Sequence, residues 1–197
     1  MRNLTKSFAT LLIAASTVSA TPALQAASEG FVARLRVIDI EPDVSSDIGG
    51  LDVDNKVSGE VGLTYFLTPN WAADLGIATA KHDITLNGAN IGSAKILPVN
   101  LIAQYHFGSG WPVRPYVGAG VNYTRFSDTE IAGGAIGLDS SSFGPVLQVG
   151  VDWPVTDVFF VNADLKKIWI GTDATGAASG KIDIDPWVFG VGVGFKF

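Results

Sequence analysis

Charged side chains occur at alternate positions within otherwise apolar segments of this 197-residue chain. Six of them share this placement: Arg34, Arg36, Glu60, Asp74, Asp164 and Lys166. Charges that share a protein interior must pair, because an isolated buried charge is expensive to desolvate. Arg34 and Arg36 could therefore pair with Glu60 or with Asp164. The pairs could form a selectivity ring in a pore or a structural network; we favour the network, since internal ion pairs mainly satisfy one another.

Other residues offer little catalytic, metal-binding or cofactor chemistry. The chain has no cysteine, which excludes thiol nucleophiles and thiolate metal sites. No serine or carboxylate is visibly matched with His82 or His106, so we do not expect an enzyme. Acidic residues of the connecting segments match no calcium-loop template and are interpreted as a solvated rim rather than as a metal site. Glycines alternate within strands instead of forming a phosphate loop, and we expect no cofactor.

The elements that carry these residues have a period of two, which is typical of β-strands. In the segment 57–65, for example, Val57, Val61 and Leu63 alternate with Ser58 and Glu60. Eight segments show this alternation: 31–40, 57–65, 71–79, 97–107, 116–126, 143–153, 159–170 and 183–197. Each has about ten residues or slightly more, the length that a tilted membrane strand requires.

Composition helps to distinguish a soluble β-barrel from a β-barrel that spans a membrane. The chain is 47% hydrophobic and 16% charged, yet it contains no apolar run of about 18 residues that could form a membrane helix. A lipocalin-like soluble barrel would face its charges towards water. Here the less apolar face is rich in glycine and amides and poor in charge, which suits a narrow interior and favours a barrel surrounded by lipid. The net charge of −6 is scattered, so we expect no nucleic-acid partner.

The connections between the predicted strands alternate in length. Three are short, near residues 68–70, 108–114 and 154–158, and four are longer, centred on 45–54, 82–94, 127–141 and 171–182. Short periplasmic turns and long extracellular loops are typical of outer-membrane barrels. Aromatic residues near both ends, among them Tyr116 and Phe126, are predicted to form two belts at the membrane surfaces. The sequence thus predicts an all-β, eight-stranded antiparallel transmembrane barrel.

The first residues have the pattern of a secretory signal peptide. Arg2 and Lys6 precede a short apolar stretch, and small residues follow it. We expect cleavage after Ala26, with Ala20 as the alternative site. Residues 27–197 would then form a single barrel domain in the bacterial outer membrane.

Several segments carry a resemblance to a known family: 96–107, 114–126, 148–152 and 184–189. Their order and spacing resemble the OmpW family of outer-membrane proteins, most specifically in Pro-Tyr-Val-Gly-Ala-Gly-Val-Asn-Tyr and Asp-Pro-Trp-Val-Phe. The resemblance implies a narrow lumen and passive entry of small, largely hydrophobic molecules. Phe197, Phe195 and Val193 resemble the terminal signal that the outer-membrane assembly machinery reads. Expected partners are that machinery, outer-membrane lipid and lipopolysaccharide, and small hydrophobic solutes.

The predicted lumen is more polar than the family's hydrophobic channel. The candidate lumen-lining residues are Arg34, Arg36, Glu60, Asp74, Asn100, Gln104, Asn122, Gln148, Asp164 and Lys166. Asp164 and Lys166 occupy positions where some relatives have an apolar or aromatic residue. Two hypotheses follow. One is a channel that releases solutes sideways, with Pro98 loosening a strand. The other is a non-conducting barrel with a plugged lumen and partner-binding loops.

Overall fold

The computed structural model describes residues 30–108, 111–176 and 179–197, apart from the side chain of Glu130. The predicted signal peptide, residues 1–26, lies outside this range. The described chain is almost entirely β-structure, with one 3-10 turn at Ala132–Gly134. Within it, no helix has the length and apolarity needed to cross a membrane.

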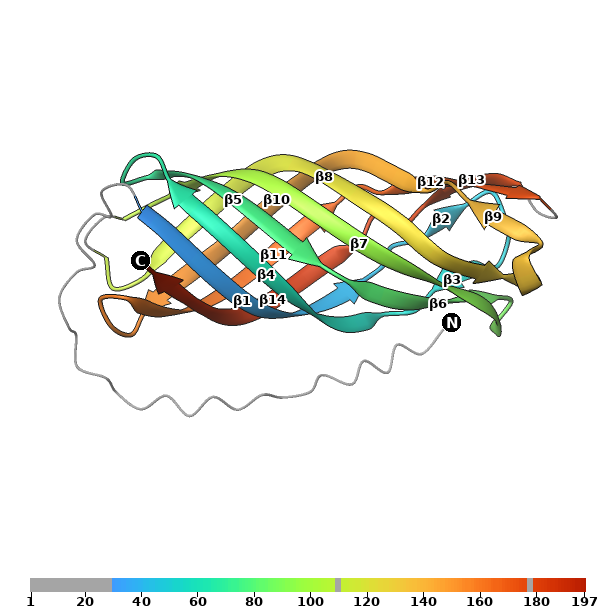
Figure 1. Ribbon diagram of the computed structural model, residues 1–197, viewed down its shortest axis with the longest axis horizontal. Coiled ribbons are helices and arrows are strands. Elements are labelled where there is room, and N and C mark those ends of the chain that lie inside the picture. The colour runs from blue at the N-terminus through green and yellow to red at the C-terminus, as the bar shows by residue number, and fades with distance from the viewer. Residues whose placement is uncertain (1–29, 109–110, 177–178) are drawn as a thin grey trace, which may run out of the picture.

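Eight strands close into an antiparallel barrel (Figure 1). They are β1 (Gly30–Glu41), β4 (Lys56–Phe66), β5 (Trp71–Ala78), β7 (Ala89–His106), β8 (Arg114–Ile131), β10 (Ser141–Pro154), β11 (Phe159–Ile168) and β14 (Trp187–Lys196). Each pairs with its neighbours along the chain, and β14 returns to pair with β1, which closes the ring. The predicted eight-stranded barrel is confirmed. Its short-turn end, where β1 begins and β14 ends, is the periplasmic end of this topology.

Alternation along each strand separates a lipid-facing surface from an interior. On β4, Val61 and Leu63 are exposed, whereas Glu60 and Thr64, which flank them along the strand, are buried. Two aromatic residues depart from the predicted belts, because Tyr116 and Phe126 are buried in the barrel. They lie on the same face of β8 as Asn122 and Thr124, so strand parity, rather than closeness to a strand end, decides where their rings point.

The long connections are built largely of further strands and not of irregular loops. Six short strands supply them: β2 (Ser45–Ser46), β3 (Leu51–Val53), β6 (Ala80–Leu86), β9 (Ile136–Leu138), β12 (Gly171–Gly176) and β13 (Gly180–Asp183). Together with the far ends of β7 and β8 they extend the barrel wall at the end away from the C-terminus (Figure 1). Inward-facing residues such as Ile84 and Ile131 bury one face of this wall, which explains why these segments fold as strands.

The interior is divided into layers along the barrel axis. An apolar cluster, here called the girdle, lies nearer the extracellular end and contains Ile38, Ile40, Ala78, Ala80, Ile102, Phe126, Val146, Ile168, Ile170 and Val188. A smaller cluster at the periplasmic end contains Val32, Phe66, Ala72 and Phe160. The buried charged side chains and the amides of Gln104, Gln148 and Asn162 occupy the space between these two apolar layers, whereas Asn100 and Asn122 lie beside girdle residues.

Glycine is required where neighbouring strands leave no room for a side chain. At Gly192 on β14, an added Cβ would lie 2.7 Å from the Cα of Arg36 and would also overlap the carbonyl oxygen of Leu35. Real Cβ atoms do not approach backbone this closely, so the strands would have to move apart. At Gly59 on β4, by contrast, no heavy atom lies within 4 Å of such a Cβ.

We therefore expect Gly192→Ala to destabilise the barrel by about 1–3 kcal/mol, the usual effect of overpacking. Gly59→Ala, the matched control on another strand that pairs with β1, should change stability by less than about 0.5 kcal/mol. Urea unfolding in lipid vesicles, followed by tryptophan fluorescence, measures both. Equal effects of the two substitutions would contradict the close packing at Gly192.

Candidate functional site

A buried ion-pair network fills the middle of the barrel. Glu60 lies at the centre of this network. It accepts hydrogen bonds from Arg36 Nη1 at 2.5 Å and from Lys166 Nζ at 2.9 Å. Lys166 Nζ also lies 3.1 Å from Asp164 Oδ2, and Arg36 Nε lies 3.8 Å from the same oxygen. Two cations on β1 and β11 are thus shared between two carboxylates on β4 and β11, and this tie crosses the barrel interior.

Arg34 forms a second group of ion pairs nearer the periplasm. Its Nη2 donates to Asp152 Oδ2 at 2.8 Å, and its Nη1 lies 3.2 Å from Asp74 Oδ1. Thr64 lies between Arg34 and Asp74, accepting from the guanidinium and donating to the carboxylate. The guanidinium also packs over the rings of Phe160 and Tyr116, at 5.4 and 5.7 Å from their centroids.

Amide side chains link these groups to one another. Asn162 accepts a hydrogen bond from Arg36 Nε at 2.7 Å and donates one to Asp152 Oδ1 at 2.7 Å, so it joins the two ion-pair groups. Gln148 donates to Asp164 Oδ2 at 2.5 Å and accepts from Gln104 Nε2 at 2.8 Å. A bond from Asn122 Nδ2 to Asn100 Oδ1, 2.9 Å long, lies on the β7–β8 side. All ten candidate lumen residues named from the sequence are buried in this interior.

The buried charges balance within the described residues. Four cations, Arg34, Arg36, Arg114 and Lys166, accompany four carboxylates, Glu60, Asp74, Asp152 and Asp164. Balance matters here because each unpaired charge would bear a desolvation penalty of several kcal/mol. We call the ion pairs of Arg34, Arg36 and Lys166 with their four carboxylates, together with the linking amides, the polar plug.

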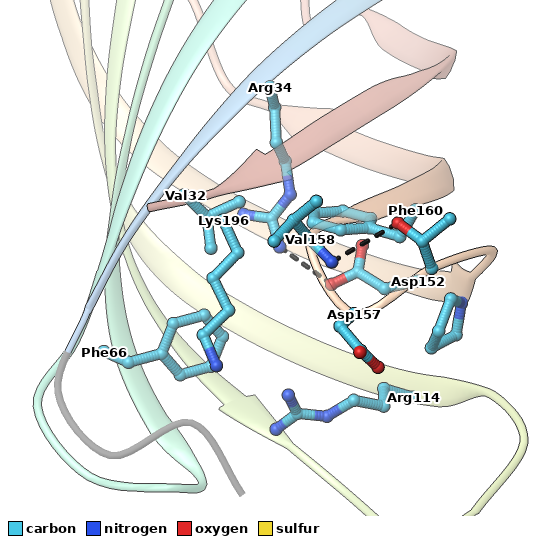
Figure 2. Close-up of a pocket in the computed structure, with 11 residues that line it drawn as sticks. Val32, Arg34, Phe66, Arg114, Asp152, Asp157, Val158, Phe160 and Lys196 are labelled. Atoms are coloured by element: carbon cyan, nitrogen blue, oxygen red, sulfur yellow. Dashed lines mark hydrogen bonds and ion pairs between the residues drawn. The ribbon is translucent and has the colours of Figure 1, made fainter. Parts of the chain in front are cut away.

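The periplasmic end leaves little space beneath the polar plug. Figure 2 shows Arg34 paired with Asp152 at the top of a cavity that Phe66, Arg114 and Lys196 border. Its volume is about 20 Å³, enough for one or two water molecules. Arg114 donates to the carbonyl oxygen of Pro69 at 2.9 Å and packs over the ring of Phe66, closing this end further.

The extracellular end encloses a cavity of a different kind. It has a volume of about 50 Å³ and thirteen lining residues, of which only Thr172 has a polar side chain. The aliphatic lining comes from five of the short strands and from β7 and β8, and includes Leu51, Ile84, Leu86, Ile91, Leu138 and Ile182. Ile184 lines this cavity and also packs against the girdle, so an apolar surface continues inward until it meets the polar plug.

Four buried residues that contact the plug or belong to it were not among the candidates identified from the sequence. Asp152, Thr64, Asn162 and Tyr116 all have the parity of the inward face, which is the signal that could have identified them. The proposed partners were also incomplete. Arg36 pairs with Glu60 and Asp164, two partners that the sequence suggested, but Arg34 pairs with Asp74 and Asp152. Pair choice depends on strand tilt and on side-chain reach, which strand parity does not specify.

The two histidines lie in different environments. His106 is buried near the periplasmic end, where its Nε2 is 3.1 Å from Gln104 Oε1. His82 lies on β6 in the extracellular wall, and its Nδ1 is 2.9 Å from the carbonyl oxygen of Asp54. Burial lowers the pKa of His82, so its ring is neutral at pH 7 and donates from Nδ1. Among the described residues, no group of three or more His, Cys, Asp or Glu side chains could hold a metal ion.

The lipid-facing apolar band, the closed ring of strands and the polar interior define an outer-membrane β-barrel. The family model of the OmpW family matches residues 25–197. Outer membrane protein W of Vibrio cholerae is 32% identical over 91% of this chain and 94% of its own length. The chain belongs to the OmpW family.

Solved structures agree with this assignment. The crystal structure of OprG from Pseudomonas aeruginosa superposes with a TM-score of 0.79, at 26% identity, over 89% of this chain and 99% of OprG. The solution structure of E. coli outer membrane protein W gives a TM-score of 0.63 at 29% identity, over 86% and 98% of the two chains.

Removal of one plug cation should destabilise the barrel strongly. In Arg34→Leu, Asp74 and Asp152 lose their counter-charge, and we expect a loss of about 3–5 kcal/mol of unfolding free energy. Lys181→Gln, at an exposed pair with Asp183, should leave the unfolding midpoint almost unchanged, because water screens such a pair. Urea unfolding in vesicles measures both variants.

A partial recovery in the double variant Arg34→Leu/Asp152→Asn would show that the loss arises from the stranded charge and not from lost volume. If Arg34→Leu unfolded at the same urea concentration as the unchanged protein, the plug would not be a stabilising network.

Proposed function

We propose that this barrel admits small hydrophobic molecules from the extracellular side and releases them sideways into the membrane. The observation that carries the proposal is the apolar cavity above the girdle. Aliphatic side chains from several short strands converge there, so the cavity is suited to an apolar molecule and not to water. Burial of apolar surface favours an apolar ligand by roughly 25 cal/mol per Å².

The polar plug argues against passage along the barrel axis. A hydrophobic molecule that reached the girdle would next have to displace paired charges and amides, leaving them without partners. Below the plug, the space beside Arg114 holds only about 20 Å³. Entry from outside is therefore compatible with exit through the wall and not with exit through the periplasmic end.

The barrel wall is interrupted at the height of the girdle. The β10–β11 ladder ends at Val146 and Ile168, and pairing resumes only where Leu138 of β9 meets Ala174 of β12. Three single hydrogen bonds cross this interruption, which we call the β10–β12 seam. They are Trp169 N to Pro145 O, Gly171 N to Ser142 Oγ and Asp139 N to Asp173 O, each 3.1 Å long.

A shorter interruption lies beside Pro98, the residue singled out in the sequence. The β5–β7 ladder ends at Ile77 and Val99, and the β6–β7 ladder begins at Ala80 and Ile96. Proline has no N–H to donate, which weakens the wall at this point. Both interruptions border girdle residues, and the β10–β12 seam is the longer of the two.

A charge placed in the cavity should abolish uptake. Ala174 faces the cavity and its neighbour Thr175 is exposed, so Ala174→Glu and Thr175→Glu form a matched pair. With vesicles whose outer leaflet is lipopolysaccharide, we expect Ala174→Glu to reduce uptake of a small hydrophobic fluorescent dye to the protein-free rate. Thr175→Glu should behave like the unchanged barrel.

Closure of the seam should also slow uptake. Because the chain has no cysteine, Ser142→Cys/Thr172→Cys can be bridged with a short, reducible bis-thiol reagent across the seam. We expect bridging to slow dye uptake and reduction to restore it. A bridge between Val117→Cys and Val149→Cys, which face each other on an intact ladder, should have no effect. If uptake persisted with the seam bridged, the exit would lie elsewhere, with Pro98 as the next position to bridge.

The balanced polar plug also supports a second candidate function, a non-conducting barrel whose extracellular strands bind surface partners. The uptake measurement separates the two. If the unchanged barrel transferred dye no faster than protein-free vesicles, the channel proposal would fail and the non-conducting barrel would remain.

A further inference from the structure

Three cations gather on the outer wall at the extracellular edge of the lipid-facing band. Lys81 on β6 lies directly opposite Lys95 on β7 in the ladder. Arg125 on β8 is opposite Leu97, two residues along β7 from Lys95, so it is the diagonal neighbour of Lys95. All three side chains are exposed. We call Lys81, Lys95 and Arg125 the basic triad.

The members of the basic triad form no ion pair with any side chain that the structure describes, a set that leaves out the side chain of Glu130. Ion pairs within 4 Å involve other surface lysines, including Lys56 with Asp83, but none of the triad. Like charges directly opposite in a ladder destabilise a sheet. Their placement side by side, in a chain of net charge −6, points to an anion that bridges them.

The height of the basic triad on the wall identifies the kind of anion. Leu97, next to Lys95 on the same face, is 40% exposed, and Tyr123, next to Arg125, is 47% exposed. These side chains end the apolar band, and the ring of Tyr123 is of the type that lies at headgroup level. The triad is therefore level with the headgroups of the outer leaflet and faces lipid, outside the lumen.

We propose that the basic triad binds the phosphates of lipopolysaccharide, at its lipid A portion. The outer leaflet on this side presents phosphates to the barrel wall, and acyl chains would lie below against Leu97 and Tyr123. Guanidinium and ammonium groups match phosphate oxygens as charge-assisted donors, with Arg125 able to bind two oxygens at once. The site is independent of solute passage, since it lies on the opposite face of the wall from the cavity.

The test uses the folded barrel in detergent micelles, titrated with bisphosphorylated lipid A and followed by native mass spectrometry. The variant is Lys81→Gln/Lys95→Gln/Arg125→Gln. Its control, Lys167→Gln/Lys181→Gln/Lys196→Gln, has the same net charge. We expect the triad variant to bind lipid A about a hundredfold more weakly, given about fivefold for each of the three cations near an anionic surface, and the control to stay within about twofold.

Two further arms identify the ligand. Monophosphorylated lipid A should bind the unchanged barrel more weakly than the bisphosphorylated form, and phosphatidylglycerol more weakly still. Equal binding by the triad variant and the unchanged barrel would overturn the site. An equal loss of lipid A binding in the control variant would show that net charge, and not the basic triad, determines binding. Binding of phosphatidylglycerol as tight as that of lipid A would overturn the assignment of the ligand to lipid A.

Unfolding checks that the triad variant is intact. Without lipid A it should unfold at the same or a higher urea concentration than the unchanged barrel, since its opposed charges are gone. With lipid A, only the unchanged barrel and the control should gain stability, because a ligand stabilises the state that binds it. Equal stabilisation of the triad variant would also contradict the proposal.

Discussion

A barrel of eight strands has an interior only wide enough for side chains or one small ligand. Every inward charge must therefore find its partner within a few ångströms. In this chain Arg34, Arg36 and Lys166 share four carboxylates, and Asn162 joins the two groups. The remaining features of the interior follow from this constraint, since the polar plug occupies the middle of the barrel and separates two apolar regions.

The two apolar regions have different consequences. Below the polar plug, Phe66, Ala72 and Phe160 pack tightly with Val32 and leave almost no free space. Above it, the girdle opens into a cavity that the short extracellular strands build. The hydrogen-bond ladders are interrupted at the height of the girdle, so the barrel wall is weakest there. This is also the height at which the polar plug would stop a hydrophobic molecule. The cavity, the polar plug and the seam thus act together in the proposed lateral route.

Strand parity made much of the fold predictable. A period of two placed Glu60, Asp74 and Asp164 on one face, and the alternating connection lengths gave the topology. The signal was weaker in the segments expected to be loops, since strands as short as Leu51–Val53 are defined by neighbours far away in sequence. Parity also could not show that Arg34 reaches Asp152, 118 positions along the chain, because that contact depends on strand tilt and closure. Tyr116 was misplaced when its nearness to a strand end was given more weight than its parity.

The separation of the interior by the polar plug can be measured with two cysteines on one strand. Ala78 and Ala72 both face inward on β5, in the girdle and in the periplasmic cluster respectively, and the chain has no other cysteine. A small apolar thiol reagent is added to the extracellular side of oriented vesicles containing Ala78→Cys or Ala72→Cys. We expect rapid labelling at position 78 and protection at position 72. Equal labelling rates at the two positions would show that the polar plug does not separate the two apolar regions.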